Sequence, residues 1–292
     1  MGNVSRVLIT GAGGFIGQAT VTAAKEAGLG VVASGRAQID LGARDATAKL
    51  QDAMVQCDAV IHLAAAMGGN AAEHDRVTIN GTRAVLTAMQ GAEVRKLVLV
   101  SSMSVYRLEA LAPGETLSST SELDTPETAR DTYARAKCEQ EALAQKAGIA
   151  SLTILRPGIV YSDTRLWNAH LGIGVGPVLF SFPKHTALPM CSVTHLAQTI
   201  IDETQHPSGG AHLVVDPELP SRGIVIDQLR QTGWPKMVLP FPWGALRLAA
   251  SAISPIDKKL PGLLRGRVLE QRMYPMGRVD AGALTWHPSE AQ

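Results

Sequence analysis

A tyrosine and a lysine in this sequence have the spacing of a proton-transfer pair. Tyr133 and Lys137 lie within residues 131–147, whose pattern predicts a helix. Residues four positions apart on a helix share a face and lie on adjacent turns. A free tyrosine has a pKa of about 10, and a nearby cation lowers that pKa by roughly 1–3 units. The pair therefore suits acid–base chemistry on an oxygen atom, although an incidental Tyr and Lys on a solvated helix would have the same common spacing.

A serine-rich segment could supply a hydroxyl to the same chemistry. Residues 101–106, Ser-Ser-Met-Ser-Val-Tyr, directly follow the apolar run Leu97–Val100, which predicts a buried strand. In doubly wound sheets, ligands bind at the carboxyl ends of the strands. A hydroxyl there could hydrogen-bond a substrate carbonyl or alkoxide oxygen. Ser102 is the candidate for this role, whereas Ser101 is explained by a plain strand-to-loop exit.

Residues 10–17, Thr-Gly-Ala-Gly-Gly-Phe-Ile-Gly, predict a turn that cradles phosphate. An apolar strand pattern precedes them and a helical pattern, Gln18–Ala27, follows, which is the context that a dinucleotide fingerprint requires. Gly11 allows a tight turn, Gly14 lets the backbone approach a pyrophosphate, and Gly17 lets the helix lie close to the sheet. The helix N-terminus adds free N–H groups and a partial positive charge. A glycine-rich turn without a ligand is the alternative.

Apolar strands and helical patterns alternate through the first half of the chain. Continuous Val, Ile and Leu runs separated by helices indicate a parallel sheet covered on both faces. Right-handed crossovers make this a doubly wound α/β sheet. The expected strands are 7–9, 30–33, 59–63, 97–100, 152–155 and 211–215, and the expected helices are 18–27, 46–56, 73–91, 131–147, 194–205 and 221–233.

The alternation of strands and helices breaks after Pro157. Residues 158–192 are rich in Gly and Pro, and residues 240–275 mix Pro with short apolar helices. We therefore expect a second, smaller and irregular α/β lobe. The expected division is a dinucleotide-binding domain of residues 1–156 plus about 194–216, and a substrate-binding lobe of residues 157–193 plus 217–292.

Six ordered motifs between residue 5 and about residue 215 give the chain a resemblance to a known family. Together they resemble the extended short-chain dehydrogenase/reductase family, also called the NAD-dependent epimerase/dehydratase family, which implies a Rossmann fold. Residues 284–288, Leu-Thr-Trp-His-Pro, resemble the family's C-terminal motif more weakly. The six motifs are residues 10–17, Asp58–Ala65, Asn80-Gly81-Thr82, Ser101-Ser102 with Val105-Tyr106, Tyr133 with Lys137, and Leu155-Arg156-Pro157 with Val160-Tyr161.

The resemblance implies a role for each matched residue. Tyr133 would protonate or deprotonate the substrate oxygen, and Lys137 would lower the Tyr133 pKa and hold the nicotinamide ribose. Ser102 would orient the substrate carbonyl, with Ser104 as its nearest competitor. The other implied cofactor contacts of these motifs are Gly11, Gly14, Phe15, Ile16, Gly17, Leu63, Ala64, Ala65, Asn80 and Pro157.

The segment after the second expected strand favours NADP over NAD. NAD-binding proteins usually carry an acidic residue there that bonds the ribose 2′-hydroxyl. At the end of this strand the chain has Ser34 and Arg36 and no carboxylate. Arg36 could bind a 2′-phosphate through two hydrogen bonds. Asp40 and Leu41, next along the chain, resemble the family's pair beside the adenine amine. A solvated loop arginine is the alternative interpretation of Arg36.

The composition disfavours several other kinds of partner and ligand. A net charge of +1 gives no general attraction to nucleic acid or membranes, and 4% aromatic residues disfavour stacking on single-stranded nucleic acid. The three cysteines are far apart and lack a CxxC motif, which favours a reducing compartment and disfavours a disulfide framework or a metal site. The sequence begins with a strand pattern instead of a signal peptide, so we expect a cytoplasmic location.

These features lead us to expect an NAD(P)-dependent oxidoreductase that interconverts a carbonyl and an alcohol, on a nucleotide sugar or related sugar derivative. Residues 221–292 hold ten Lys or Arg against five Asp or Glu, which fits a sugar diphosphate and equally fits ordinary surface charge. A nucleotide-sugar epimerase and an NADP-binding regulatory protein without turnover are the alternatives. Met103 and Ser104 stand where the family's 4,6-dehydratases carry an Asp-Glu pair, which disfavours dehydration. The resemblance also implies a homodimer.

Overall fold

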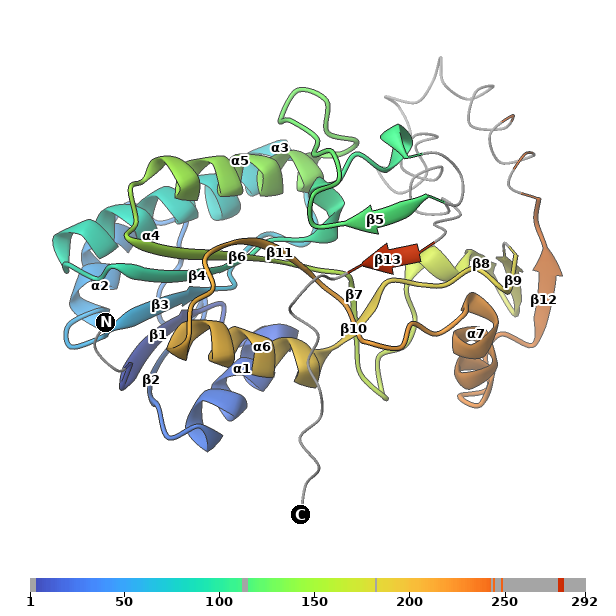
Figure 1. Cartoon of the computed structure of the whole chain (residues 1–292), viewed down its shortest axis with the longest axis horizontal. Coiled ribbons are helices and arrows are strands. Elements are labelled where there is room, and N and C mark those ends of the chain that lie inside the picture. The colour runs from blue at the N-terminus through green and yellow to red at the C-terminus, as the bar shows by residue number, and fades with distance from the viewer. Residues whose placement is uncertain are drawn as a thin grey trace.

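A six-stranded parallel sheet forms the centre of the molecule (Figure 1). The computed structural model describes residues 4–111, 115–181, 183–242, 244, 248 and 278–280. The strands are β1 (Arg6–Thr10), β2 (Gly30–Ser34), β3 (Ala59–His62), β4 (Lys96–Val100), β6 (Ser151–Pro157) and β11 (Gly210–Val214). Their order is β11-β6-β4-β3-β1-β2, and each neighbouring pair is parallel. The predicted doubly wound α/β sheet is confirmed.

Helices cover both faces of this sheet. One face is covered by α1 (Phe15–Glu26) and α6 (Val193–Gln205), and the other by α2 (Ala46–Ala53), α4 (Asn80–Gly91) and α5 (Thr132–Lys146). Each face has its own apolar core, one built around Leu97 and Val85 and the other around Val98 and Leu196. Because the strands are buried on both sides, their sequences are continuous apolar runs instead of alternating ones.

The chain reverses its direction of travel across the sheet at β1. From β1 it passes to β2 at the sheet edge, and β3 then lies on the other side of β1. The carboxyl ends of β1 and β3 therefore form a topological switch point, where open α/β sheets bind ligands. Thr10 lies opposite His62 in the parallel ladder, so the glycine turn after β1 and the segment after β3 leave the sheet together.

The helix predicted over residues 73–91 is interrupted in the structure. It consists of α3 (Ala71–His74), the π-turn η1 (Asp75–Ile79) and α4. Asn70 caps α3 by accepting a hydrogen bond from the backbone N–H of Glu73. A π-turn widens one helical turn and occurs often at functional sites. The predicted long helix is present, and the π-turn within it is a local change in winding that the spacing of apolar residues does not report.

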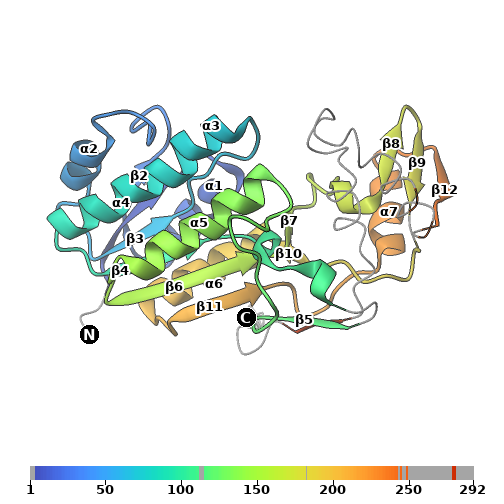
Figure 2. The same cartoon turned by 90° about the horizontal axis from the view of Figure 1, so that it is seen from above.

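Short strands and one helix form a smaller unit beyond the carboxyl ends of the central strands (Figure 2). Its core contains Leu171, Leu179 and Ile226. The unit contains the 3-10 turn η4 (Ala169–Leu171), the helix α7 (Arg222–Arg230) and a sheet of β8 (Ile173–Val175), β9 (Val178–Ser181) and β12 (Met237–Pro240). The lobe boundaries expected from the sequence stay a prediction.

Two further strand pairs join distant parts of the chain. β7 (Ile159–Tyr161) pairs with β10 (Met190–Ser192), and β5 (Thr116–Ser118) pairs with β13 (Arg278–Asp280). The 3-10 turns η2 (Met103–Val105) and η3 (Leu108–Ala110) follow β4. The short helices expected at 240–275 lie largely, and the motif at 284–288 entirely, outside the described residues. Among the residues that the structure describes, no helix has the length and apolar character needed to span a membrane.

Candidate active site

The glycine turn after β1 is closed by contacts that only glycine permits. Gly11 has a φ of +70°, and a Cβ on it would lie 2.9 Å from the backbone nitrogen of Ala64. A Cβ on Gly17 would lie 2.1 Å from the carbonyl oxygen of Gly11. Gly13, in contrast, has no atom within 4 Å of the position of a Cβ. Gly11 and Gly17 therefore close the turn, while Gly13 faces open space.

The turn leads directly into the N-terminus of α1, where the local charges suit a phosphate. The N-cap is Gly14, so no side chain caps the helix, and its first turn holds no acidic residue. The free N–H groups and the helix dipole at such an end attract anions. The Arg165 guanidinium also stacks on the Phe15 ring, 4.8 Å from its centroid. These residues fit the pyrophosphate of a dinucleotide.

Tyr133 and Ser102 meet at the carboxyl end of β4. Tyr133 lies in the first turn of α5 and Ser102 lies just beyond β4, near enough for Ser102 to act on the pKa of Tyr133. Burial raises the pKa of Tyr133, while the Ser102 hydrogen bond and the charge of Arg130 act against that rise. The expected lowering of this pKa by Lys137 is therefore not found. At pH 7 Tyr133 is a neutral phenol, which can donate a proton.

Lys137 lies buried one turn further along α5, held by two acceptors. Its Nζ donates to the carbonyl oxygen of Val100 and to the Oε1 of Gln140, both at 2.9 Å. Burial lowers the pKa of Lys137 to about 8, because an ammonium loses its hydration there. The ammonium is still the main form at pH 7, and it lies between the end of β4 and α5.

A chain of polar side chains links Lys137 to the glycine turn. Gln140, which accepts from Lys137, donates to the Oγ1 of Thr82 at 2.8 Å and lies 3.3 Å from the Nε2 of His62. The Nδ1 of His62 lies 2.7 Å from the Oγ1 of Thr10, at the end of β1. Burial, and secondarily the charge of Lys137, lowers the pKa of His62 to about 3. His62 is thus a neutral imidazole that holds β1, β3 and α5 together.

A cap and a buried ion pair fix the position of α5. Asp131 caps the helix by accepting a hydrogen bond from the backbone N–H of Ala134 at 2.7 Å. Arg156 on β6 donates two hydrogen bonds to Glu141 on α5, at 3.0 and 2.7 Å. The side chains of this pair are only 4% and 6% exposed. The helix that carries Tyr133 is therefore anchored at its start and near its middle.

The predicted residues at the ends of β3 and β6 lie along the same edge of the sheet. Residues 63–65 leave β3 beside the glycine turn, where the N–H of Ala64 donates to the Oγ1 of Thr10 at 3.4 Å. Pro157 ends β6, opposite Val214 of β11. Phe15 and Ile16 begin α1.

Asn80, a predicted cofactor contact, is the first residue of α4. It is exposed, and its Oδ1 accepts a hydrogen bond from Arg83 at 3.3 Å. In the same helical segment, Thr78 has a buried Oγ1 that accepts a hydrogen bond from the N–H of Ala66, beyond the end of β3, at 2.9 Å. Sequence reasoning missed Thr78, although its place in the buried stripe of a helical pattern was a usable signal.

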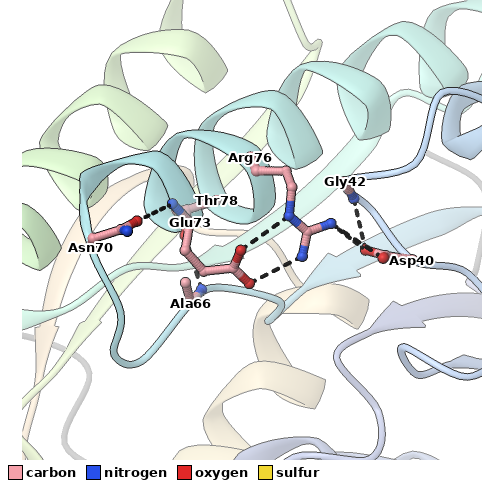
Figure 3. Close-up of polar contacts among 7 residues, drawn as sticks. All are labelled: Asp40, Gly42, Ala66, Asn70, Glu73, Arg76 and Thr78. Atoms are coloured by element: carbon pink, nitrogen blue, oxygen red, sulfur yellow. Dashed lines mark hydrogen bonds and ion pairs between the residues drawn. The ribbon is translucent and has the colours of Figure 1, made fainter.

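Arg36 and Asp40 follow β2, next to the glycine turn. A Cβ on Gly35 would lie 3.7 Å from the backbone nitrogen of Gly13, which places this loop against the turn. Arg36 is exposed, whereas the Asp40 carboxylate is bound by Arg76, as Figure 3 shows. A hollow of about 430 Å³ opens here, lined by Ala12, Gly13, Gln18, Val21, Thr22, Ala33, Gly35 and Gln38.

Leu41 lies beneath this loop and packs on the start of α4. It is buried, and a Cβ on Gly81 would lie 2.9 Å from the Cβ of Leu41. Gly81 therefore lets α4 approach the loop closely. The contact fixes the segment between β2 and α2 next to the site.

Cys191, His195 and Asp216 form a separate group whose ligand atoms lie within 4.8 Å of one another. Hydrogen bonds account for this group: Asp216 accepts from the backbone N–H of Ser192 at 2.9 and 3.1 Å, and lies 2.9 Å from the His195 Nδ1. Burial raises the pKa of Cys191, so in this hydrogen-bonded arrangement its thiol stays protonated. The group links β10, α6 and the end of β11.

The parallel sheet, the glycine turn at its switch point and the buried acid–base residues together define a dinucleotide-binding enzyme family. Residues 7–171, more than half of the chain, match the model of the NAD dependent epimerase/dehydratase family. The protein belongs to this family. The resemblance and the general class of enzyme predicted from the sequence are thereby confirmed.

Individual relatives are more distant. A 4-hydroxy-2-methyl-3-oxo-4-farnesyl-3,4-dihydroquinoline-1-oxide ketoreductase from Stigmatella aurantiaca is 24% identical, over 94% of this chain and 87% of its own length. The UDP-glucose 4-epimerase of Thermus thermophilus, solved with NAD, has a TM-score of 0.63 at 19% identity, over 92% of this chain and 98% of its own. The dTDP-4-dehydrorhamnose reductase of Bacillus anthracis, solved with NADP, has a TM-score of 0.64 at 17% identity, over 82% of this chain and 84% of its own. Both structures share the fold.

Proposed function

We propose that this protein is an NADP(H)-preferring oxidoreductase that interconverts a ketone and an alcohol, with Tyr133 as its proton donor. The observation that carries the proposal is the position of Tyr133, at the start of α5, next to Ser102 at the carboxyl end of β4. Because its pKa is raised, the phenol remains protonated at neutral pH. Reduction of a carbonyl needs a proton at the oxygen, and a positioned phenol supplies it.

Three side chains have distinct roles in this reduction. Ser102 donates a hydrogen bond to the substrate carbonyl oxygen and orients it. Tyr133 then transfers its phenolic proton to that oxygen as the alcohol forms. Lys137, held by Val100 and Gln140, places a positive charge one turn from the phenolate that remains. When bound, the nicotinamide supplies the hydride that the carbonyl carbon receives.

Arg36 supports the preference for NADP. Its exposed side chain follows β2 without a neighbouring acidic residue in the strand, beside the glycine turn. A guanidinium matches a phosphate through paired hydrogen bonds. The variant Arg36→Ala should weaken NADPH binding by about tenfold or more, the scale of a charge-assisted hydrogen bond, and change NADH binding little. Equal losses for the two cofactors would contradict the preference.

Two kinds of ketone are supported as substrates. The Bacillus anthracis structure is that of a reductase named for a dTDP-linked keto-sugar, which agrees with the nucleotide sugar expected from the sequence. The Stigmatella aurantiaca relative is named for a quinoline ketone with a farnesyl chain. We place the keto-sugar nucleotide first and the polycyclic ketone second.

The experiment is a turnover assay with purified protein, NADPH and both ketone classes. We expect NADPH consumption with one class, slower consumption with NADH, and loss of turnover in Tyr133→Phe. Tight NADPH binding without turnover on any ketone, together with no effect of Tyr133→Phe, would favour a regulatory protein instead.

An epimerase is the second candidate, supported by the fold shared with the Thermus thermophilus UDP-glucose 4-epimerase over 92% of the chain. An epimerase oxidises and re-reduces the same carbon, so it forms product without net use of cofactor. Incubation with UDP-glucose and a catalytic amount of cofactor distinguishes the two, because only an epimerase forms more product than the cofactor present, up to the equilibrium between the two epimers. The homodimer stays a prediction, which light scattering of the purified protein tests.

A further inference from the structure

We propose that Arg76 sets the preference for a 2′-phosphate by keeping two carboxylates away from Arg36. The inference rests on the proposed use of NADP(H) and names a residue that acts through others. Arg76 belongs to the π-turn η1, which is remote in sequence from the loop after β2. It is a positioning residue, since it contacts the neighbours of Arg36 instead of the phosphate.

Arg76 lies between Asp40 and Glu73 and binds both (Figure 3). Its Nε and Nη2 donate to the two carboxylate oxygens of Glu73, each at 3.0 Å. Its Nη1 lies 3.2 Å from both carboxylate oxygens of Asp40. Asp40 also accepts the N–H of Gly42 at 3.0 Å. One guanidinium therefore holds the loop after β2 to the helical segment after β3.

Arg36 is close enough to both carboxylates to feel their charge. The hydrogen bond from the N–H of Gly42 is the largest cause of the lowered pKa of Asp40. The hydrogen bond from Arg76 is the largest cause of the lowered pKa of Glu73. The charge of Arg36 lowers both pKa values further. Among the residues that the structure describes, no ion pair is recorded for Arg36 itself. Arg76 satisfies the two carboxylates, so Arg36 stays available to an incoming phosphate.

Removing Arg76 would leave an excess negative charge in this group of side chains. Asp40 and Glu73 would then attract Arg36 and repel a 2′-phosphate bound beside it, because the charge of Arg36 already acts on both carboxylates. A ribose 2′-hydroxyl is neutral and would be little affected. The loss should therefore fall on NADPH and spare NADH.

Gly42 provides a way to move Arg76 without removing a charge. A Cβ on Gly42 would lie 2.1 Å from the Nη1 of Arg76 and 2.8 Å from its Cζ. The backbone of Gly42 is outside the left-handed region, so alanine is compatible with its conformation. The conflicting atoms include the flexible end of a long side chain, so Gly42→Ala displaces the guanidinium at constant net charge.

The test measures dissociation constants of NADPH and NADH by fluorescence titration of the full chain. Arg76→Gln should weaken NADPH by about tenfold and NADH by less than about threefold, the range of one charge-assisted hydrogen bond. Gly42→Ala should act in the same direction. The matched control is Arg83→Gln, which removes an exposed arginine of α4 that pairs with Glu139 and should leave the NADPH to NADH ratio unchanged.

A second substitution separates the electrostatic effect from misfolding. Adding Glu73→Gln to Arg76→Gln removes one of the two carboxylates that lose Arg76, which cancels the excess negative charge and should restore most of the NADPH affinity. Equal losses for both cofactors, an effect equal to that of Arg83→Gln, or no recovery in the double variant would overturn the inference. A wild-type protein without a preference for NADPH would instead contradict the proposed function. A preference that depends on Arg36 but survives Arg76→Gln would contradict this inference alone.

Discussion

The Nζ of Lys137 donates a hydrogen bond to the carbonyl oxygen of Val100, 2.9 Å away. Val100 is the last residue of β4, and Ser102 follows two positions later. Lys137 thereby ties the helix that carries Tyr133 to the strand that leads into Ser102. This ammonium therefore contributes, with the Asp131 cap and the Arg156–Glu141 pair, to the relative position of the phenol and the hydroxyl.

Tyr133→Phe should abolish most of the ketone reduction while the protein stays folded. Loss of a positioned general acid costs about 10²–10⁴-fold in rate, and NADPH binding should change little. The measurement is kcat/KM together with the NADPH dissociation constant. Tyr106→Phe is the matched control, because it removes a buried hydroxyl that contacts Arg156 at 3.3 Å, and it should keep most of the activity. Near-normal rates in Tyr133→Phe would exclude Tyr133 as the proton donor.

His62 should make the protein sensitive to acid. In the unfolded chain this histidine binds a proton near pH 6.5, whereas in the folded protein its pKa is lowered to about 3 by burial first and by Lys137 second. Between these values the unfolded state binds more protons, so stability falls as the pH falls from 6.5 to 3. His62→Gln should flatten this part of the curve of unfolding free energy against pH. His185→Gln, at an exposed position, is the control, and an equal slope in wild type and His62→Gln would contradict the assignment.

The ion pair between Arg156 and Glu141 should be important for folding. Glu141→Gln leaves the Arg156 guanidinium buried and without its anionic partner, which typically costs about 3–5 kcal/mol. Glu139→Gln on the same helix affects a partly exposed carboxylate that pairs with Arg83 and Arg135, and should cost about 1 kcal/mol or less. Urea unfolding of both variants measures the difference. Similar losses of unfolding free energy in the two variants would show that the buried pair stabilises the protein no more than the partly exposed one.

Gly17 and Gly13 should differ sharply in their tolerance of alanine. A Cβ on Gly17 conflicts with the carbonyl oxygen of Gly11 at 2.1 Å, whereas a Cβ on Gly13 meets nothing within 4 Å. Gly17→Ala should lower the unfolding free energy by about 1–3 kcal/mol, the usual cost of overpacking. Gly13→Ala should leave the cofactor-free protein close to wild type. Thermal unfolding without cofactor tests this, and a reversed order of the two variants would refute the closed geometry of the turn.

The central sheet could be predicted because its strands are buried on both faces and therefore appear as apolar runs. Val7–Ile9 and Leu97–Val100, for example, lie within the observed strands β1 and β4. The small strands could not be predicted in this way. β5 and β13 are three residues each and pair across most of the chain, so no local pattern defines them.

The candidate site was predictable only where a residue of a suitable chemical type lies at the end of a predicted strand or the start of a predicted helix. Ser102 directly follows a strand and Tyr133 begins a helix, and the two meet in the structure. Gln140 gave no such signal, because its partners Thr82 and His62 lie 58 and 78 positions away. The pKa of Tyr133 also could not be derived from the spacing to Lys137, since burial outweighs the influence of nearby charges.

The number of residues in the π-turn Asp75–Ile79 determines which side chains face the loop after β2. Deleting one residue there would restore regular α-helical winding and change which side chains of the turn face the loop after β2. Arg76 would leave Asp40, whereas Val85 would keep its place in the core. A one-residue change of length in this turn would therefore alter the side chains beside the loop after β2 while the core of the sheet stays in place.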